Sequence, residues 1–412
     1  MADTAERPLA GTEETHARYG TPTVVSYHVN GPLDRDLLDT AVRLLPRHHP
    51  VLTAHISHPP RGPMLRATNR PAPALDVNLD TDQATRLFTD EEPLFRPTLQ
   101  PHGPTQHTLY LAVHHAVSDG ASVLALHRLL WNIYTHLVTG ETWTPPEPDH
   151  VLPDPIEPRF TTNITEKHLS DYISRTSSPQ PGTEIPPDTD TAENGLHHHH
   201  LTIPPNEAAT LTNTARKHGL GTNALLFGAL AAAARHHITP HHRPLPVTYP
   251  LPIDLRPFTE PPTPDDHMCA AIATTYPQVH ATIRDTPAEL GKSLWDSVSA
   301  TIANNEFRYE LAGFSDLWKR HQQHRPTLLI SSLLGRCRSL PLPDELSTAE
   351  PSFPVEPPTT CPAVGIGNAP DGTIGLDVLH RRRHYTREHA RRFAHTVREH
   401  VQNATAEAQE EL

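Results

Sequence analysis

Residues 106–120 have the sequence QHTLYLAVHHAVSDG, in which an apolar run ends in two histidines and is followed by a short polar loop. The run over residues 106–115 has the length and composition of a buried strand. Residues 120–138 then place apolar side chains at helical spacing along one face: Val123, Leu126, Leu130, Ile133 and Leu137. This order predicts a strand, a loop and a helix of an α/β fold, and loops after strands commonly carry the reactive groups of such folds.

His114 and His115 in this loop are the strongest candidates for chemistry. Histidine titrates near neutral pH, so a neutral imidazole can take a proton from a hydroxyl or an amine. Adjacent side chains of a strand point to opposite sides of the sheet. We therefore expect one histidine to be a general base and the other a structural neighbour, and the spacing alone does not say which.

Asp119 and Gly120 end the same loop. A carboxylate at position 119 could orient an imidazole, as in a catalytic triad, or it could cap the following helix or pair with a buried arginine. We favour the structural interpretation for Asp119. Gly120 would let a substrate approach the backbone closely, because glycine carries no side chain.

The rest of the chain alternates between strand and helix patterns. In the first half, residues 21–29 predict a strand, residues 33–48 a helix that Pro50 ends, and residues 51–56 a strand. Residues 141–195 are rich in proline and acidic residues, which predicts a linker with a short helix near 164–174. In the second half we expect strands at 197–203, 245–255, 268–279 and 326–334, a hairpin at 361–380, and helices at 204–220, 222–237 (capped by Thr222 or Asn223) and 386–409. The predicted domains are therefore residues 1–140 and 196–412, joined by the linker 141–195.

The composition argues against several classes of protein. A formal net charge of -13 over 412 residues disfavours nucleic-acid binding, which needs a basic surface. No run approaches the ~20 apolar residues of a membrane span, and the first residues lack the apolar stretch of a signal peptide. Cys269, Cys337 and Cys361 are far apart and odd in number, which indicates reduced thiols and a cytoplasmic location.

Several other patterns suggest further sites, and each has a simpler interpretation. The run His197–His200 invites a zinc site, but no HExxH or cysteine–histidine spacing accompanies it, so we interpret it as compositional and expect no metal. Gly291-Lys292-Ser293 ends like a phosphate-binding loop but lacks the earlier glycine, and residues 313–317 (GFSDL) fail the hydrolase motif at their last position. The arginines near residues 381–383 and 391–392 could dock a phosphopantetheine arm or an acidic carrier protein, and we favour a solvated helix face.

HHAVSDG, residues 114–120, resembles the HHxxxDG motif of the condensation-domain and CoA-dependent acyltransferase superfamily. Further segments are similar in order and spacing to the polyketide-associated acyltransferases: residues 7–14, 44–56, 222–237, 250–258 and 328–343. The first motif is specific and the others support it, and together they cover most of the chain. The DFGWG motif of the plant acyltransferase branch is absent. The resemblance implies an α/β (α+β) fold of two chloramphenicol-acetyltransferase-like domains, arranged as a V-shaped pseudo-dimer with a central tunnel.

The resemblance also implies roles for single residues. It makes His115, the second histidine of the motif, the general base, with His114 beside it. It gives Asp119 a structural role in an ion pair with Arg256 of the IDLR segment. Many relatives have an asparagine near the glycine of the late strand, where this chain has SSLLG, and Ser332 is our candidate for the oxyanion contact there. No metal and no bound cofactor are implied.

The function implied is transfer of an acyl group to a small-molecule alcohol or amine in natural-product or lipid biosynthesis. The donor would be acyl-CoA or an acyl-phosphopantetheinyl carrier protein, and we expect a monomer. One alternative is a catalytically silent condensation-like domain that recruits carrier-protein partners. Another keeps the fold but changes the chemistry to cyclisation or dehydration. The intact histidine motif favours the transferase.

Overall fold

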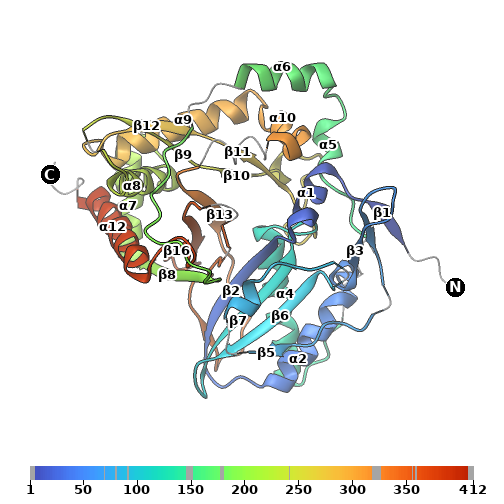
Figure 1. The fold of residues 1–412 in the computed structure, drawn as a ribbon. Coiled ribbons are helices and arrows are strands. Elements are labelled where there is room, and N and C mark those ends of the chain that lie inside the picture. The colour runs from blue at the N-terminus through green and yellow to red at the C-terminus, as the bar shows by residue number, and fades with distance from the viewer. Residues whose placement is uncertain are drawn as a thin grey trace. The chain divides into compact units, whose positions relative to one another are not determined.

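The computed structural model describes residues 5–68, 70–78, 81–90, 92–144, 152–176, 181–240, 242–317, 326–354, 356–357 and 360–406. These residues belong to two units, each of which mixes helices with β-sheet (Figure 1). Unit 1 comprises residues 1–163, 254–272 and 337–353, and unit 2 comprises residues 164–253, 273–336 and 354–412. The mixed α/β class expected from the sequence is confirmed.

The units are not continuous in the sequence, because two segments from the second half of the chain belong to unit 1. One of them, residues 254–272, contains Arg256, and the other, residues 337–353, contains a strand of the unit 1 sheet. The described part of the expected linker contains two helices, α5 (Pro158–Thr161) and α6 (Glu166–Thr176). The two compact units therefore do not coincide with the expected domains 1–140 and 196–412. The domain boundaries at 140 and 196 stay a prediction.

Unit 1 is built on a five-stranded sheet with strand order β14-β2-β7-β6-β5. β2 (Pro22–Asn30) and β7 (Gln106–His114) pair antiparallel along their whole length, and β6 (Phe95–Pro101) pairs antiparallel with β7 on the other side. The outer strands are β14 (Ser347–Thr348) and β5 (Asp76–Val77). The central strand β7 thus has a partner on each side, which buries it and fixes the place where it ends.

Helices and a smaller sheet complete unit 1. α2 (Arg35–Leu44) and α4 (Gly120–Thr139) pack against each other, and α4 also contacts β2. The smaller sheet has the order β1-β4-β3, with strands Glu6–Pro8, Met64–Arg66 and His55–Ser57. The remaining elements are α1 (Gly11–Tyr19), α3 (Thr81–Thr85), and the 3-10 turns Leu45–Arg47, Pro50–Thr53 and Arg256–Phe258.

Unit 2 is built on a four-stranded sheet with strand order β13-β15-β16-β8. Its strands are β13 (Leu329–Arg336), β15 (Ala363–Asn368), β16 (Ile374–Arg381) and β8 (Leu196–Ile203). β15 and β16 form the expected hairpin, and β8 lies antiparallel to β16 at the edge. The other elements are α7 (Pro205–Lys217), α8 (Thr222–His236), α9 (Pro287–Ala303), α10 (Phe307–Ala312), α12 (Arg387–Ala406), β9 (Leu245–Thr248), β10 (Leu251–Asp254), β11 (Ile272–Thr275) and β12 (Gln278–Ala281).

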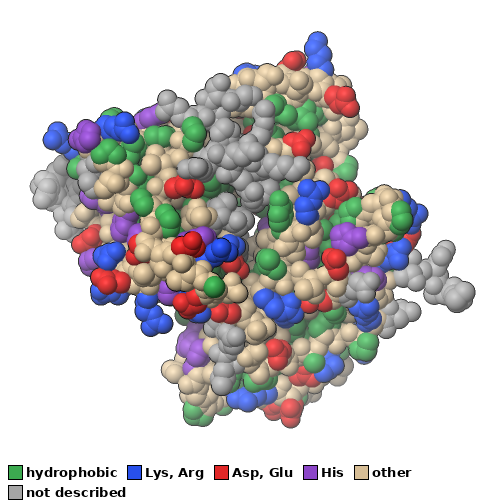
Figure 2. Space-filling view, viewed as in Figure 1, with side chains coloured by type: hydrophobic (Ala, Val, Ile, Leu, Met, Phe, Trp, Pro, Cys, Tyr) green, Lys and Arg blue, Asp and Glu red, His purple; other side chains and the backbone are tan. Residues whose placement is uncertain are grey.

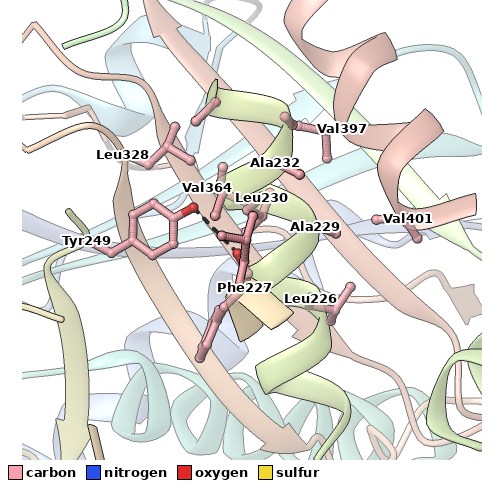
Figure 3. Close-up of a cluster of buried hydrophobic side chains, with 14 of the residues drawn as sticks. Leu226, Phe227, Ala229, Leu230, Ala232, Tyr249, Leu328, Val364, Val397 and Val401 are labelled. Carbon is pink, nitrogen blue, oxygen red and sulfur yellow. Dashed lines mark hydrogen bonds between the residues drawn. The ribbon is translucent and has the colours of Figure 1, made fainter. Parts of the chain in front are cut away.

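The core of unit 2 centres on α8, which is apolar around most of its circumference. Figure 3 shows its side chains between those of α12, such as Val397 and Val401, and those of the sheet, such as Val364. α8 also contacts α9 closely, because a Cβ atom on Gly228 would lie 1.7 Å from the carbonyl oxygen of Pro287. Gly291 of α9 approaches Ala224 in the same way, which explains this glycine by packing rather than by a phosphate site.

Several local predictions differ from the structure, among them the strand expected at 268–279, which is divided between β11 and β12 in two different sheets. Residues 50–53 form a 3-10 turn, not the start of a strand, because proline at its first position favours a turn. The N-cap of α8 is Gly221, since the Thr222 hydroxyl bonds to the hydroxyl of Thr212 instead (3.0 Å). The stretch 245–255 forms two strands, β9 and β10, and Pro250 between them has no N–H for a continuous ladder.

On the visible face, basic side chains lie among acidic ones (Figure 2). None of the described helices combines the length and the hydropathy of a membrane-spanning segment. The three cysteines are buried and form no disulfide.

Candidate active site

The histidine motif begins where strand β7 ends. The backbone N–H of His114 donates to the carbonyl of Leu94 (2.9 Å), and that of His115 donates to the carbonyl of Thr21 (2.8 Å). The hydroxyl of Ser118 then bonds back to the carbonyl of His114 (3.1 Å), which holds the turn closed. The two histidines therefore lie on either side of a strand end and have different surroundings.

His114 is a buried structural residue, with 4% of its surface exposed. Its Nδ1 accepts a hydrogen bond from the backbone N–H of Ala116 (3.1 Å), so Nε2 carries the proton of the neutral ring. Its ring packs near that of Phe88, with centroids 5.3 Å apart. Burial first, and then the neighbouring His115, lower the pKa of His114 to about 3. His114 is thus neutral and holds the turn.

His115 has the tautomer that a general base requires. Its Nδ1 lies 2.8 Å from the carbonyl oxygen of Ser118. A carbonyl oxygen only accepts, so Nδ1 carries the proton and Nε2 keeps its lone pair. Burial lowers the pKa of His115, although the hydrogen bond to Ser118 and the charge of Asp119 act in the opposite direction. The imidazole is therefore neutral at pH 7 and able to accept a proton at Nε2.

The ring of His16 stacks on the ring of His115. The two centroids are 4.0 Å apart and the ring planes differ by 19°. Burial, followed by the proximity of His115, lowers the pKa of His16 well below its usual range. Two neutral rings can stack without repulsion, so His16 limits the orientations open to the His115 ring.

Helix α1, which carries His16, is held at both ends. At its start, the backbone N–H and the hydroxyl of Thr12 both donate to the carboxylate of Glu157 (2.8 Å each). At its end, Gly20 has a left-handed backbone (φ 61°), and a Cβ atom there would lie 2.1 Å from the carbonyl oxygen of Phe88. Only glycine fits this close approach. These contacts fix the position of His16 against the motif.

Asp119 acts first as the N-cap of α4. Its Oδ1 accepts from the backbone N–H of Ser122 (3.1 Å), and the Ser122 hydroxyl accepts from the backbone N–H of Asp119 (2.9 Å). This reciprocal arrangement is a capping box, which satisfies two N–H groups at the helix start. Gly120 is the first residue of the helix. The helix thus begins at the motif and sets the direction of its loop.

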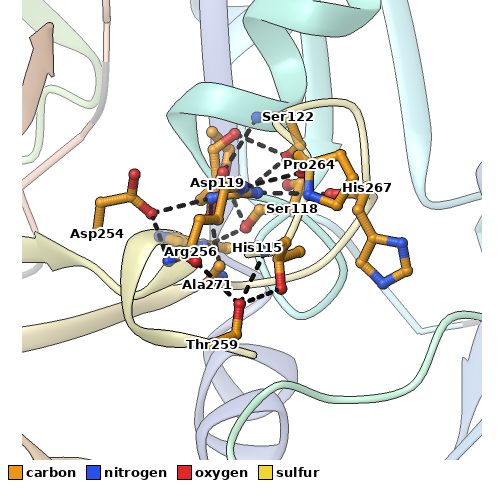
Figure 4. A network of polar contacts seen from close by, with 12 residues as sticks. His115, Ser118, Asp119, Ser122, Asp254, Arg256, Thr259, Pro264, His267 and Ala271 are labelled. Carbon is orange, nitrogen blue, oxygen red and sulfur yellow. Dashed lines mark hydrogen bonds and ion pairs between the residues drawn. The ribbon is translucent and has the colours of Figure 1, made fainter. Parts of the chain in front are cut away.

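The second oxygen of Asp119 binds residues distant in the sequence. Oδ2 accepts from Nη1 of Arg256 (2.6 Å) and from the backbone N–H of Ala271 (2.9 Å), as Figure 4 shows. The Arg256 and Asp119 side chains are only 3% and 2% exposed. Burial alone would lower the pKa of Arg256, but the charge of Asp119 and its hydrogen bond raise it above the usual value. Arg256 is therefore charged at pH 7.

Arg256 is itself surrounded by acceptors. Its guanidinium bonds to the carbonyls of Pro264 (3.3 Å) and His267 (3.4 Å) and lies 3.4 Å from the carboxylate of Asp254 (Figure 4). The segment 254–272 is in this way tied to the N-terminus of α4. The carboxylate of Asp119 accepts from backbone N–H groups and from Arg256, whereas Nδ1 of His115 donates to the Ser118 carbonyl. Asp119 and His115 therefore do not form the hydrogen bond through Nδ1 that a catalytic triad would have.

The sequence patterns did not predict two contacts of the candidate site, those of His16 and of the Ala271 N–H, and the side chain of a third residue, Ser332, lies outside the described residues. His16 belongs to ETHARYG, which has no motif to mark it, and the backbone N–H of Ala271 contributes through position rather than side-chain type. Ser332 lies in β13, where the backbone pairs with Gly365 of β15. The side chain of Ser332 is outside the described residues, so its oxyanion role stays a prediction.

Two family models match this chain. The model described as the condensation domain matches residues 11–240, and the model described as the C-terminus of phthiocerol/phthiodiolone dimycocerosyl transferase matches residues 192–364. Among curated proteins, phthiocerol/phthiodiolone dimycocerosyl transferase of Mycobacterium sp. (strain JLS) is 25% identical over 349 residues, covering 82% of this chain and 84% of that protein. The protein of the same name from Mycobacterium ulcerans (strain Agy99) is 28% identical over 267 residues, covering 62% and 63%.

Solved structures share the fold over nearly the whole chain. Polyketide synthase associated protein 5 from Mycobacterium tuberculosis superposes with a TM-score of 0.75 at 20% identity, covering 98% of this chain and 100% of that one. The first condensation domain of the calcium-dependent antibiotic synthetase, in complex with a substrate analogue, superposes with a TM-score of 0.74 at 17% identity, covering 97% and 96%. The arrangement of elements around the histidine motif is therefore that of a known fold.

Proposed function

The chain belongs to the condensation-domain family, and on this basis we propose that it is an acyltransferase in which His115 is the general base. The donor is a thioester of CoA or of a phosphopantetheinyl carrier protein, and the acceptor is an alcohol or an amine. The names of the mycobacterial relatives describe acyl transfer in lipid assembly, and we place this chain in the same kind of pathway, lipid or natural-product biosynthesis. The observation that carries the proposal is the tautomer of His115.

The proposed reaction needs one proton acceptor and no covalent acyl-enzyme. Nε2 of His115 takes the proton of the acceptor hydroxyl or amine while the acceptor oxygen or nitrogen attacks the thioester carbonyl. The tetrahedral intermediate then collapses, the carbon–sulfur bond breaks, and the protonated imidazole returns the proton to the departing thiolate. The products are an ester or an amide and a free thiol.

The surrounding residues support this role by position. Ser118 keeps Nδ1 protonated through its carbonyl, and His16 restricts the ring from one face. Asp119 and Arg256 hold the loop and the start of α4 in place. An oxyanion in the intermediate requires preorganised donors, for which Ser332 remains our candidate. Such donors are commonly worth ~10²–10³ in rate.

The test compares the wild-type protein with His115→Ala on a panel of acyl-CoA and acyl-carrier thioesters with alcohol and amine acceptors. Thiol release and acylated product are followed by mass spectrometry. We expect a loss of at least about a hundredfold in the variant, the usual contribution of a general base. His58→Ala serves as a control, because His58 lies on the surface in the same unit and pairs with Asp90.

Equal rates in wild type and His115→Ala would refute the base role. Turnover only with the carrier-bound donors would identify the donor class. Absence of product with every donor, with the protein folded, would instead favour a silent domain that recruits carrier proteins.

A further inference from the structure

The histidine run 197–200 lies in β8, the edge strand of the unit 2 sheet (Figure 1). Side chains alternate along a strand, so His198 and His200 share one face and His197 and His199 share the other. The burial pattern follows this alternation, with His198 and His200 more exposed than the other two. The run is thus divided by the sheet into two pairs with separate surroundings.

Strand β16 brings a carboxylate to the more exposed pair. Asp377 is directly opposite His200 in the antiparallel register, and His198 is opposite Leu379, two positions along. Oδ1 of Asp377 lies 2.7 Å from Nε2 of His198 and 2.8 Å from Nδ1 of His200. One ligand atom from each of the three residues lies within 4.8 Å of the others.

The three groups differ in burial in a way that suits ion binding. The Asp377 side chain is 1% exposed, whereas the side chains of His198 and His200 are each 32% exposed. A buried carboxylate therefore contacts two imidazoles that an ion can reach from solvent.

The run alone predicted no metal site, but its two more exposed histidines now meet a carboxylate, and we propose that His198, His200 and Asp377 form a binding site for a divalent transition metal ion of the zinc type. Two imidazole nitrogens and a carboxylate oxygen are ligands that zinc accepts, and three protein ligands leave a fourth position for water. Zinc bonds to nitrogen and oxygen are ~2.0 Å, so tetrahedral ligand atoms are separated by roughly 3.3 Å. The two nitrogen–oxygen distances must therefore lengthen by about half an ångström, which rotamer adjustments of exposed histidines can supply.

Binding exchanges protons for the ion in a defined way. The protons now shared between each imidazole and Asp377 leave the ligand nitrogens, either by moving to the other ring nitrogen or by release from a charged ring. The ion replaces both hydrogen bonds with bonds to the same three atoms.

The bound ion would join the edge strand β8 to β16 through their side chains. It would add a cross-link to the backbone pairing that already links residues 196–203 to residues 374–381. The consequence is stability of unit 2, independent of the acyl transfer proposed for the histidine motif in unit 1. The site can thus be tested apart from activity.

The experiment uses the full-length protein, prepared without a polyhistidine tag and treated with chelator. Zn²⁺ is titrated in competition with a chromophoric chelator, and Co²⁺ is added separately to record the visible absorbance of a tetrahedral site. The test variants are His198→Ala, which alters an exposed side chain, and Asp377→Asn, which keeps the shape of the buried one. The matched controls are His199→Ala, on the other face of β8, and His218→Ala, at the exposed end of α7.

We expect one tight Zn²⁺ equivalent in the wild type and in both controls, with tetrahedral Co²⁺ absorbance. In each test variant the Zn²⁺ affinity should fall by at least about a hundredfold. Loss of a residue that only supports a ligand commonly lowers metal affinity ~10–100-fold, and loss of the ligand itself costs more. Zn²⁺ should also raise the melting temperature of the wild type but not of His198→Ala. The proposal would be overturned if the wild type and both test variants bound Zn²⁺ with equal affinity. It would also be overturned if the wild type bound Zn²⁺ no more tightly than His198→Ala does.

Discussion

Replacing Asp119 by asparagine tests the buried network that holds the histidine loop. Both carboxylate oxygens are in use, Oδ1 toward the N–H of Ser122 and Oδ2 toward Arg256 and the N–H of Ala271. An asparagine has one acceptor oxygen. If that oxygen keeps the helix cap, the NH₂ group faces the donors of Arg256 and Ala271.

The magnitude follows from the burial of the pair. Removing one partner of a buried ion pair costs ~3–5 kcal/mol, because the remaining charge is left without compensation. The carboxylate of Asp254 remains 3.4 Å from Arg256, but its side chain is 52% exposed and it is only a partial substitute. We therefore expect Asp119→Asn to lower the free energy of unfolding by about 3 kcal/mol.

The assay is urea denaturation followed by far-UV circular dichroism. Asp254→Asn is the matched control, since it removes the half-exposed partner of the same guanidinium and should cost under about 1 kcal/mol. The double variant Asp119→Asn/Arg256→Met removes both charges and should be more stable than the sum of the single losses predicts. A cost for Asp119→Asn equal to that of Asp254→Asn would refute the reasoning.

Three further predictions concern pH, titration of buried groups and helix packing. Because burial lowers the pKa of His115, the acid limb of kcat/KM should lie below about pH 6.5, with the rate rising as the pH increases and the imidazole loses its proton; a limb above pH 7 would contradict this. His127 is buried in α4, where its Nε2 lies 3.0 Å from the carbonyl oxygen of Val25. Burial lowers the pKa of His114 to about 3 and that of His127 to about 4, so the unfolded chain binds more protons than the folded one below about pH 6.5. The free energy of unfolding should therefore fall by up to ~1.4 kcal/mol per pH unit per group down to about pH 4. Urea curves at pH 7.5, 6 and 5 measure that slope, and a flat profile would rule it out. Gly228→Ala should lower the melting temperature through a loss of at least ~1–3 kcal/mol, because its Cβ would meet the Pro287 carbonyl, whereas Gly103→Ala has open space and should behave like the wild type.

Local patterns in the sequence were sufficient for the strand, loop and helix around the motif. Residues 106–115 and 120–138 correspond to β7 and α4, because periodicity of apolar residues reflects one buried face of a single element. The same reasoning placed the hairpin of β15 and β16 at its turn. It was wrong at residues 50–53 and at the cap of α8, where proline geometry and a contact with Thr212 prevailed over propensity.

The different roles of His114 and His115, one structural and one proposed as the general base, could be assigned only from the structure. Residue types alone left either histidine as the base. Which nitrogen of each ring is protonated depends on the Ala116 N–H and the Ser118 carbonyl, and these backbone groups take their positions from the turn after β7. No side-chain pattern in the sequence encodes the direction of a backbone carbonyl.

The sequence by itself determined the elements, the mixed α/β class and the motif that carries the chemistry, because each of these depends on residues close together in the chain. The ion pair of Asp119 with Arg256 followed from the family resemblance and is present in the structure. Only the tertiary structure decided the contact of Asp119 with the Ala271 N–H, the stacking of His16 on His115, and the meeting of Asp377 with two histidines of β8. Asp377 is 179 positions from His198, and Ala271 is 152 positions from Asp119. Such contacts arise from how sheets and helices pack, which a single sequence without its fold does not reveal.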